Sequence, residues 1–344
     1  MSSKFNPTRR LLLQGGASVA AFGAMTAGAP LAGLGDAFAQ AATPLPFQLS
    51  WIKSIQYGGY FAGIENGFYK KHGIDPTFNS GGPNVDPVAN VASGQSALGD
   101  RPIGSLLVAR DKGIPIKIIA TVFQTSPYAV LSLKSKPINS VKELQGKTIA
   151  VATSGRPLVL NLLRDAGLDP KSVNLVPSSP DPSALVSGQI DAYAGYVTNQ
   201  GVMLESKGIE IVALNVHELG IPETTGTIYA REDYLKANRD AVVRFLKASI
   251  ESWRWALDNP DATAKLMVEK YGNPGLDLKA QTTEIKASKP FIESGAAATK
   301  GLLALDVPLF DKIIEVYRKA DLVKGKMTAA ELCDASFIEA AHKS

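Results

Sequence analysis

The sequence predicts an α/β protein with two lobes, two crossings between the lobes and a helical C-terminal tail. Short apolar runs alternate with helical periodicity from residue 46 to residue 122, which is typical of βαβ units and a parallel sheet. A second, similar series extends from residue 148 to residue 214. After Arg231 the apolar residues recur almost only at helical spacing, so the rest of the chain is predicted to be helical.

The first series defines the start of lobe 1. Its strands are short apolar runs bounded by turn residues, and its helices carry their apolar residues on one side. The predicted elements are strand 47–51, helix 58–71, strand 74–78, helix 85–92, strand 96–99, helix 103–112 and strand 116–122.

The second series defines lobe 2, and the tail completes lobe 1. The Thr-, Gly- and Pro-rich segments 124–128 and 224–229 are the candidate crossings, which assigns residues 45–124 and 230–344 to lobe 1 and 125–229 to lobe 2. The predicted elements of lobe 2 are strand 148–152, helix 158–166, strand 174–176, helix 183–187, strand 192–195, helix 202–206 and strand 209–214. The predicted tail helices are 234–257, 262–271, 309–320 and 329–341.

The N-terminus is predicted to be a cleaved twin-arginine signal peptide, residues 1–39. Arg9 and Arg10 precede an apolar stretch that holds one charge, Asp36, and ends in the small-x-small sequence Ala-Phe-Ala at 37–39. A membrane anchor is the alternative, but the stretch is rich in Gly and Ala, whereas a spanning helix needs about 20 strongly apolar residues. We therefore expect export to the periplasm.

Charge and composition exclude several classes of function. The 36 Lys and Arg residues barely outnumber the 32 Asp and Glu residues, so we expect no nucleic-acid partner. Cys333 is the only cysteine, and the three histidines His72, His217 and His342 are scattered. We therefore predict no internal disulfide, no metal site and no cofactor.

Five segments resemble, in order and spacing, the THI5/NMT1-like group of periplasmic solute-binding proteins. They are GYFAGIENGFYKKHGI, VASGQSALGD, ARDKGIPIKIIATV, SVKELQGKTIAVATSG and LVSGQIDAYAGY. The resemblance implies a type II periplasmic-binding-protein fold. It also implies a role in an ABC importer of sulfonates, nitrate, thiamine pyrimidine precursors or related heterocycles, with the importer's permease and ATPase as partners. We expect a monomer.

The junction between the first strand and the first helix is the leading candidate site. Trp51, Gln56 and Tyr57 gather there, and the Gly58-Gly59 pair allows the backbone to approach a ligand. The resemblance also implies ligand contacts at this junction. Trp51 and Tyr57 are predicted to stack on a flat ligand, although aromatic core packing is the alternative for both.

Three more candidates in lobe 1 follow its second and third strands. Asn84 and Asp86 lie at the start of a helix, where the alternative role of Asp86 is to interact with the helix dipole. Asp100 ends the third strand and would accept hydrogen bonds from a ring amine if it faces the cleft. Pairing with nearby charges is the alternative for Asp100.

The candidates in lobe 2 lie at strand ends and in the second crossing. Ser154 and Arg156 stand at the start of a helix, whose N–H groups and dipole suit an anion or a carbonyl oxygen. A solvent-facing role is the alternative for Arg156. Tyr196 lies just past a strand end, and Thr225 lies in the crossing segment.

An enzyme is a second hypothesis, because the family includes thiamine pyrimidine synthases that use bound pyridoxal phosphate. Their pattern has a lysine and, four residues later, a histidine, where this chain has Arg101 and Ser105. Their cysteine cluster is replaced by Thr-Thr-Gly-Thr at 224–227. Arginine cannot form the Schiff base and serine cannot donate an imidazole, so no catalytic residue is predicted.

The sequence thus predicts a periplasmic solute-binding component of an ABC importer. The predicted ligand is a small heterocycle, similar to a thiamine pyrimidine precursor or a flavin, held in a cleft between the lobes. A sulfonate- or nitrate-type anion bound at residues 154–156 is the alternative ligand. Abundant aromatic residues at the first junction favour the heterocycle.

Overall fold

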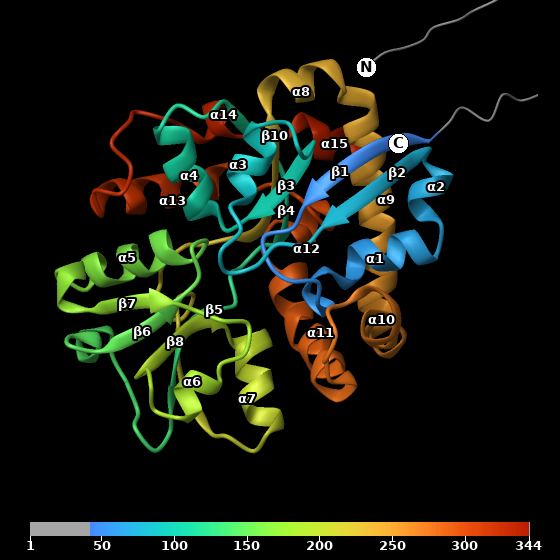
Figure 1. The fold of residues 1–344 in the computed structure, drawn as a ribbon. Coiled ribbons are helices and arrows are strands. Elements are labelled where there is room, and N and C mark those ends of the chain that lie inside the picture. The colour runs from blue at the N-terminus through green and yellow to red at the C-terminus, as the bar shows by residue number, and fades with distance from the viewer. Residues whose placement is uncertain (1–41, 344) are drawn as a thin grey trace, which may run out of the picture. The chain divides into compact units, whose positions relative to one another are not determined.

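A computed structural model of the protein describes residues 42–343, which lie within one compact unit. Figure 1 shows two separate β-sheets flanked by helices, and this arrangement confirms the predicted α/β class with a helical C-terminal region. The predicted signal peptide, residues 1–39, lies outside the described residues. Among the helices described, none is both long enough and apolar enough to cross a bilayer.

Lobe 1 is built on a five-stranded sheet in the order β2-β1-β3-β10-β4. Strand β1 pairs in parallel with β2 and β3, whereas β10 runs antiparallel to both β3 and β4. Strands β3, β4 and β10 are almost continuously buried, as expected where helices cover both faces of a sheet, whereas the edge strand β2 alternates between buried and more exposed residues. The strands are β1 (Thr43–Gln48), β2 (Ile74–Asn79), β3 (Leu98–Arg101), β4 (Ile116–Phe123) and β10 (Thr225–Arg231).

The connecting helices of lobe 1 follow the predicted order with one difference. The predicted helix 58–71 is divided in two because Gly67 adopts a left-handed conformation, with φ at 70°, that ends regular helix. The helices are α1 (Gly58–Glu65), α2 (Phe68–Lys71), α3 (Pro87–Ala92) and α4 (Ile103–Asp111).

Lobe 2 is built on a second five-stranded sheet in the order β7-β6-β8-β5-β9. Strand β6 pairs in parallel with β7 and β8, and β5 runs antiparallel to β8 and β9. The strands are β5 (Tyr128–Leu133), β6 (Thr148–Val151), β7 (Asn174–Pro177), β8 (Ala192–Tyr196) and β9 (Ile211–Asn215). The helices are α5 (Arg156–Asp165), α6 (Ser183–Val186) and α7 (Val202–Ser206), and a π-helical turn (Val197–Gly201) precedes α7.

The C-terminal tail packs mainly onto lobe 1. Its longest helix, α9, lies against α1 and α15, and the buried Trp253 makes an edge contact with the Tyr60 ring at 5.5 Å. Trp253 is therefore a core residue. The tail helices are α8 (Glu232–Ala237), α9 (Arg239–Asp258), α10 (Pro260–Leu266), α11 (Leu278–Glu293), α12 (Ala297–Lys300), α13 (Val307–Lys319), α14 (Ala329–Leu332) and α15 (Ser336–Lys343).

Larger differences from the sequence prediction concern β10, β5 and α11. Residues 224–229, predicted to be a crossing, belong mostly to β10, a buried strand near the centre of the lobe 1 sheet. Threonine favours strands, and this preference outweighs the turn tendency of the Thr-Gly-Thr sequence. Strand β5 and helix α11 were not predicted. Helix α11 holds Pro290 in its interior and buries polar side chains, so its sequence lacks a clear apolar stripe.

Two segments connect the sheets, residues 124–127 and residues 216–224. The backbone N–H of Ser126 donates to the carbonyl of Glu223 at 3.1 Å, so the two connections lie side by side. The buried Glu223 carboxylate accepts from the Tyr317 hydroxyl at 3.0 Å, which ties the second connection to α13. Burial raises the pKa of this carboxyl to about 8.

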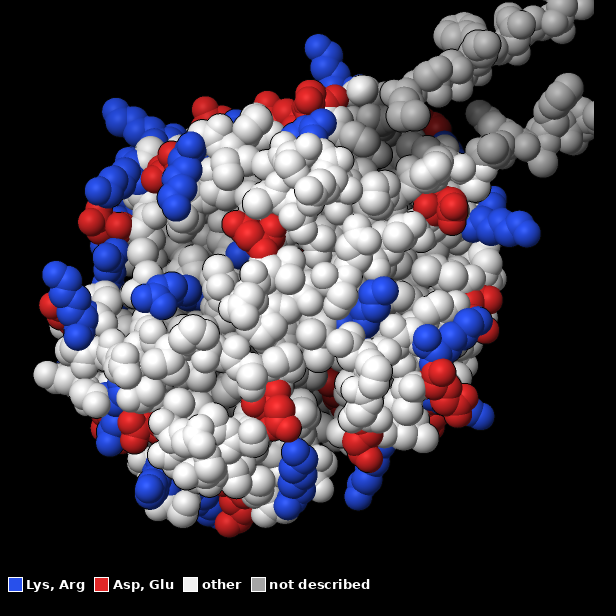
Figure 2. All heavy atoms as spheres, viewed as in Figure 1, with Lys and Arg blue, Asp and Glu red and all other residues white. Residues whose placement is uncertain are grey.

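Charged side chains of both signs are interspersed over the face shown in Figure 2. Exposed charged side chains of the described residues form pairs, as Lys134 does with Glu210 at 2.7 Å. Such exposed pairs each contribute only about 0–1 kcal/mol, so they support solubility more than stability.

Candidate functional site

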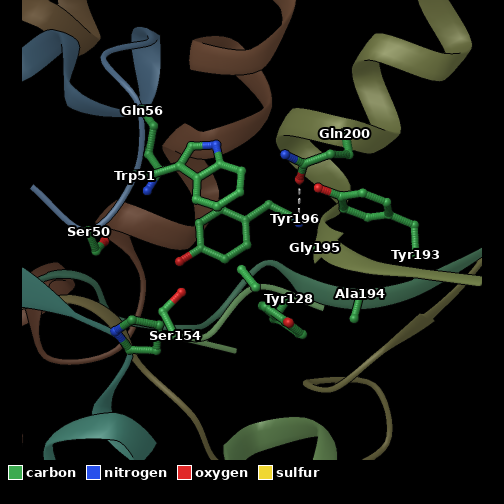
Figure 3. A pocket seen from close by; sticks show the side chains of 12 residues that line it. Ser50, Trp51, Gln56, Tyr128, Ser154, Tyr193, Ala194, Gly195, Tyr196 and Gln200 are labelled. Atoms are coloured by element: carbon green, nitrogen blue, oxygen red, sulfur yellow. Dashed lines mark hydrogen bonds between the residues drawn. The ribbon is translucent and has the colours of Figure 1, made fainter. Parts of the chain in front are cut away.

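A cavity of about 40 Å³ lies where the strand ends of the two lobes meet (Figure 3). Lobe 1 contributes residues that follow β1 and β3, and lobe 2 contributes residues of β5 and β8 and of the turns after β6 and β8. This is the expected place for a ligand, because ligands of open α/β sheets bind at the carboxyl ends of the strands. The lining residues are Ser50, Trp51, Gln56, Pro102, Tyr128, Ala152, Ser154, Tyr193, Ala194, Gly195, Tyr196 and Gln200.

The lining is aromatic and uncharged. It includes Trp51, Tyr128, Tyr193 and Tyr196, and the rings of Tyr128 and Tyr196 meet edge to face at 5.9 Å. None of the 12 described residues drawn around it in Figure 3 is Lys, Arg, His, Asp or Glu. Such a surface suits a neutral ring, which it can contact through stacking and a few hydrogen bonds.

The cavity is narrow in this conformation. About 40 Å³ is open to the centre of a water molecule, and one water needs about 10–15 Å³ on this measure, so there is room for about three waters. The hydrogen bonds that link the lobes include these: Ser105 Oγ donates to Ser154 O at 2.8 Å, Thr153 N donates to Pro83 O at 3.3 Å, and the Tyr196 hydroxyl pairs with Thr225 Oγ1. The lobes are therefore closed on each other.

A buried network fixes the wall of the cavity that belongs to lobe 1. Ser50 donates its backbone N–H and its hydroxyl to the Asp100 carboxylate, at 3.0 and 2.9 Å. The Tyr57 hydroxyl lies 3.0 Å from Ser50 Oγ and accepts from Trp51 N at 2.9 Å and Gln56 Nε2 at 3.2 Å. Hydrogen bonds to the buried Asp100 and Tyr57 therefore fix the loop that carries Ser50, Trp51 and Gln56.

Asp100 is the only carboxylate in that network. Burial raises the pKa of its carboxyl to about 7, although the hydrogen bonds from Ser50 favour the charged form. Asp100 therefore changes its protonation state near neutral pH. Its carboxyl group is bonded to Ser50, which lines the cavity.

The wall that belongs to lobe 2 is shaped by the turn after β8. Gln200 reaches back so that its Oε1 accepts from the Tyr196 backbone N–H at 3.0 Å, as the dashed line in Figure 3 shows. Its Nε2 donates to Asn199 Oδ1 at 2.6 Å. Each polar atom of Gln200 thus forms one hydrogen bond inside the protein, and these two bonds fix the orientation of its amide.

Helix α11 connects the two walls. Asn199 Nδ2 donates to Glu284 Oε2 at 2.6 Å, and Gln281 Nε2 donates to the same oxygen at 3.3 Å. Gln281 Oε1 accepts from the Ile55 backbone N–H at 2.8 Å, in the loop that carries Trp51. Burial raises the pKa of the Glu284 carboxyl to about 8.

The ten residues predicted from the sequence fall into three groups. Trp51, Gln56, Ser154 and Tyr196 line the cavity. Tyr57, Asp100 and Thr225 are buried directly behind the lining, where they bond to lining residues. Asn84, Asp86 and Arg156 are exposed and lie outside the lining.

The geometry places two of the lobe 1 candidates outside the lining. Tyr57 cannot stack on a ligand in this conformation, because it is 2% exposed and its ring stacks on Tyr60 at 6.4 Å. Its position after a tight loop turns it inward. Asp86 has the alternative role: it caps α3 by accepting from Val88 N at 3.0 Å and pairs with Arg101 at 3.2 Å.

Asp100 and Arg156 also differ from expectation. Both Asp100 oxygens accept from Ser50, so the carboxylate does not face the cavity as an acceptor for a ring amine. Arg156 opens α5 on its outer side and, together with Asp86 and Arg101, lines a separate groove between α4 and α5. Ser154 lies in the turn before α5 and lines the cavity, whereas Arg156 is the first residue of α5 and lines the groove.

Sequence reasoning missed several lining residues. Tyr128 was read as part of a crossing, although the apolar residues after it mark the strand that it begins. Tyr193 lies inside β8 rather than past its end, and Gln200 lies four residues past the strand end, where no pattern indicates a backbone contact. The other missed residues are Ser50, Pro102, Ala152, Ala194 and Gly195.

Comparison with known proteins identifies the family. A family model described as NMT1/THI5 like matches residues 54–263. The chain belongs to this family. Riboflavin-binding protein RibY of Chloroflexus aurantiacus is 25% identical over 297 residues, which cover 84% of each chain. The formylaminopyrimidine-binding protein of Halalkalibacterium halodurans is 24% identical over 241 residues, 69% of this chain and 73% of that one.

The family also includes enzymes. A 4-amino-5-hydroxymethyl-2-methylpyrimidine phosphate synthase of Legionella pneumophila is 26% identical over 173 residues, which cover 50% of this chain and 55% of the synthase. The predicted resemblance to the family is thus confirmed, and it spans both binding proteins and synthases.

Solved structures share the fold. The alkanesulfonate-binding protein SsuA of Xanthomonas axonopodis pv. citri, bound to MOPS, has a TM-score of 0.67 at 17% identity and covers 85% of this chain and 98% of its own. A Candida albicans protein described as having the generic periplasmic binding protein fold has a TM-score of 0.62 at 14% identity, covering 85% and 96%. The predicted two-lobed periplasmic-binding-protein fold is confirmed.

Proposed function

We propose that this protein is the solute-binding component of an ABC importer and that it holds a neutral, flat heterocycle between its lobes. The observation that carries the proposal is the cavity between the lobes, with its four aromatic side chains and no charged residue among those described in its lining. Relatives that are named for binding riboflavin and formylaminopyrimidine, both nitrogen heterocycles, support the same ligand class.

The ring would lie against Trp51 from lobe 1 and Tyr196 from lobe 2. Tyrosine and tryptophan supply large flat contact areas, and an offset or edge-to-face pair contributes about 0.5–1.5 kcal/mol beyond the area it buries. Gln56 and Ser154 would bond the polar edge of the ring, because the Oε1 of the first and the Oγ of the second are not used in the hydrogen bonds of the network.

Binding requires the lobes to open. A bicyclic or tricyclic ring needs more than the present cavity offers, so the hydrogen bonds of Ser105, Thr153 and Tyr196 across the cleft would break first and re-form around the ligand. Residues 124–127 and 216–224 are the hinge in this account, because only these segments connect the two sheets among residues 42–343.

A sulfonate- or nitrate-type anion is the second candidate ligand. The structural neighbour SsuA, which is named for binding alkanesulfonates, and the basic side chains of Arg101 and Arg156 favour it. However, both arginines line the groove between α4 and α5, which is separate from the cavity, and Arg101 is already paired with Asp86. An anion in the cavity would lack a described cationic partner, which is costly for a buried charge.

A pyrimidine synthase is the third candidate, and the residues do not fit it. Arg101 and Ser105 occupy the positions where the synthases carry their lysine and histidine. Arg101 is buried and paired, and Ser105 donates its hydroxyl to Ser154 O. No described residue of the lining is a lysine, so a pyridoxal phosphate aldehyde would find no amine there.

The remaining parts of the proposal concern the context of the protein. It would be exported to the periplasm through a twin-arginine signal at residues 1–39, would act as a monomer and would deliver its ligand to a permease and an ATPase at the inner membrane. Its lobes would comprise residues 45–124 with 230–344, and residues 125–229, except that β10 belongs to the lobe 1 sheet.

A thermal-shift screen of the mature, ligand-stripped protein tests this function. The panel comprises riboflavin, formylaminopyrimidine, thiamine, taurine, a longer alkanesulfonate and nitrate. A ligand at 100 times its Kd stabilises the native state by about 2.7 kcal/mol, which raises the melting temperature by several degrees. We expect a heterocycle to do so. A shift with sulfonates alone would favour the anion, and pyrimidine release with pyridoxal phosphate and iron would favour the synthase.

A further inference from the structure

One side chain in the cavity has an unused hydrogen-bonding group. Tyr128 is 5% exposed and lines the cavity, yet its hydroxyl is buried without a hydrogen-bond partner among the described residues. The other tyrosines of the lining are bonded: the Tyr193 hydroxyl donates to Ser179 O at 2.5 Å, and the Tyr196 hydroxyl pairs with Thr225. Burying an unpaired hydroxyl costs stability, so such a group calls for an explanation.

The position of Tyr128 is fixed by its surroundings. It begins β5, which pairs with β8, and its ring meets the Tyr196 ring edge to face. Its hydroxyl lies so close to Gly155, just before α5, that a Cβ built on Gly155 would overlap it. A glycine at this position therefore lets the hydroxyl reach the first turn of α5.

The same surroundings set the direction of the hydroxyl hydrogen. The amino end of a helix carries partial positive charge, which attracts the phenolic oxygen and turns the hydrogen away from the helix. Burial raises the pKa of the Tyr128 phenol well above its ordinary value, so the proton stays on the oxygen at neutral pH. Tyr128 therefore keeps a hydrogen that it can donate on the side away from α5.

We propose that the Tyr128 hydroxyl donates the hydrogen bond by which lobe 2 recognises an acceptor atom, a ring carbonyl oxygen or a ring nitrogen, of the bound heterocycle. This inference rests on the proposed function and adds a specificity-determining residue to it. Of the side chains with a buried, unpartnered polar atom among the described residues, Tyr128 is the one that lines the cavity. Closing the lobes on the ligand would satisfy the hydroxyl and so favour the closed form.

The substitution Tyr128→Phe tests the proposal, because it removes the hydroxyl and keeps the ring. Affinity is measured by isothermal titration with riboflavin and with formylaminopyrimidine. We expect the affinity of the variant for the heterocycle that the wild type binds to fall roughly five- to tenfold, the effect of one lost hydrogen bond. The melting temperature of the ligand-free variant should equal or exceed that of the wild type, which a merely structural hydroxyl would not produce.

Tyr229→Phe is the matched control. Its hydroxyl is also buried without a partner among the described residues, but Tyr229 lies in β10 and does not line the cavity. We expect it to leave affinity within twofold of the wild type. A second variant, Gly155→Ala, keeps the hydroxyl but displaces it, and it should weaken binding as well.

The outcomes separate this inference from the proposed function. If the wild type binds neither heterocycle, the proposed function fails. If the wild type binds one of them and Tyr128→Phe binds it equally well, the hydroxyl plays no part in recognition and this inference is overturned. An equal loss of affinity in Tyr229→Phe, or a loss in Tyr128→Phe accompanied by a fall in melting temperature, would also overturn it.

Discussion

Asn199 donates its side-chain N–H to the Glu284 carboxylate across 2.6 Å, and both side chains are buried. Asn199 belongs to the turn that shapes the lobe 2 wall of the cavity, and Glu284 belongs to α11, which also holds the Ile55 N–H of lobe 1 through Gln281. One buried carboxylate thus connects the two walls between which a ligand would be held.

Removing that carboxylate should destabilise the protein. Glu284→Ala leaves the Asn199 and Gln281 amides without their acceptor in a buried position, and we expect a loss of about 3 kcal/mol in the free energy of unfolding. Glu284→Gln keeps an acceptor oxygen and should cost less. Urea denaturation measures both, with Glu293→Ala, a partly exposed residue at the end of the same helix, as a control expected within about 0.5 kcal/mol. Wild-type stability in Glu284→Ala would contradict the linking role.

Stability should fall as pH rises from about 4.5 to 8. Burial raises the pKa of Glu284 to about 8, well above its ordinary value of 4.5, so the folded state holds a proton that the unfolded state releases in this range. The contribution of Glu284 is complete below pH 4.5 and is lost as pH rises through about 8. Unfolding curves at pH 5, 6, 7 and 8 should show a shallower fall for Glu284→Gln than for the wild type. Parallel curves would show that Glu284 does not titrate this way.

Trp51 should matter for binding more than for folding. It lines the cavity and is only partly buried, so Trp51→Ala should lower affinity for a heterocycle roughly tenfold or more, whereas Trp51→Phe should retain most of it. Trp255→Ala on α9, outside the lining, is the control for loss of an indole. Titration calorimetry gives the affinities, and an unchanged value for Trp51→Ala would remove the proposed stacking wall.

Arg156 should be dispensable for a neutral ligand. It is exposed and lines the groove between α4 and α5, outside the cavity. Arg156→Ala should therefore leave affinity for riboflavin or formylaminopyrimidine within twofold of the wild type. A tenfold loss would mean that the ligand contacts the start of α5 and carries negative charge. The same titration with an alkanesulfonate distinguishes these cases directly.

Much of the fold follows from local patterns. Apolar runs and helical spacing locate most strands of both sheets and the helical tail, usually to within a few residues. The failures have physical causes: Gly67 breaks a helix whose apolar pattern continues, and α11 buries the polar residues Gln281 and Glu284 where an apolar stripe is expected. Strand β10 is buried by tertiary pairing that no local pattern reveals.

The candidate site was predictable only in part. Position at a strand end indicates Trp51, Gln56, Ser154 and Tyr196, because strand ends meet at the cleft. Whether a side chain then faces the cavity depends on the loop around it. Tyr57 and Asp100 turn inward to support Ser50, a role that requires the folded geometry to recognise.

The crystal structure of the protein with riboflavin or formylaminopyrimidine, whichever raises its melting temperature, tests the central claim most directly. We predict the ring between Trp51 and Tyr196, with an acceptor atom within hydrogen-bond distance of the Tyr128 hydroxyl. Two results would contradict the account: a ligand bound beside Arg156 in the groove between α4 and α5, or a heterocycle bound elsewhere while the cavity keeps its present form.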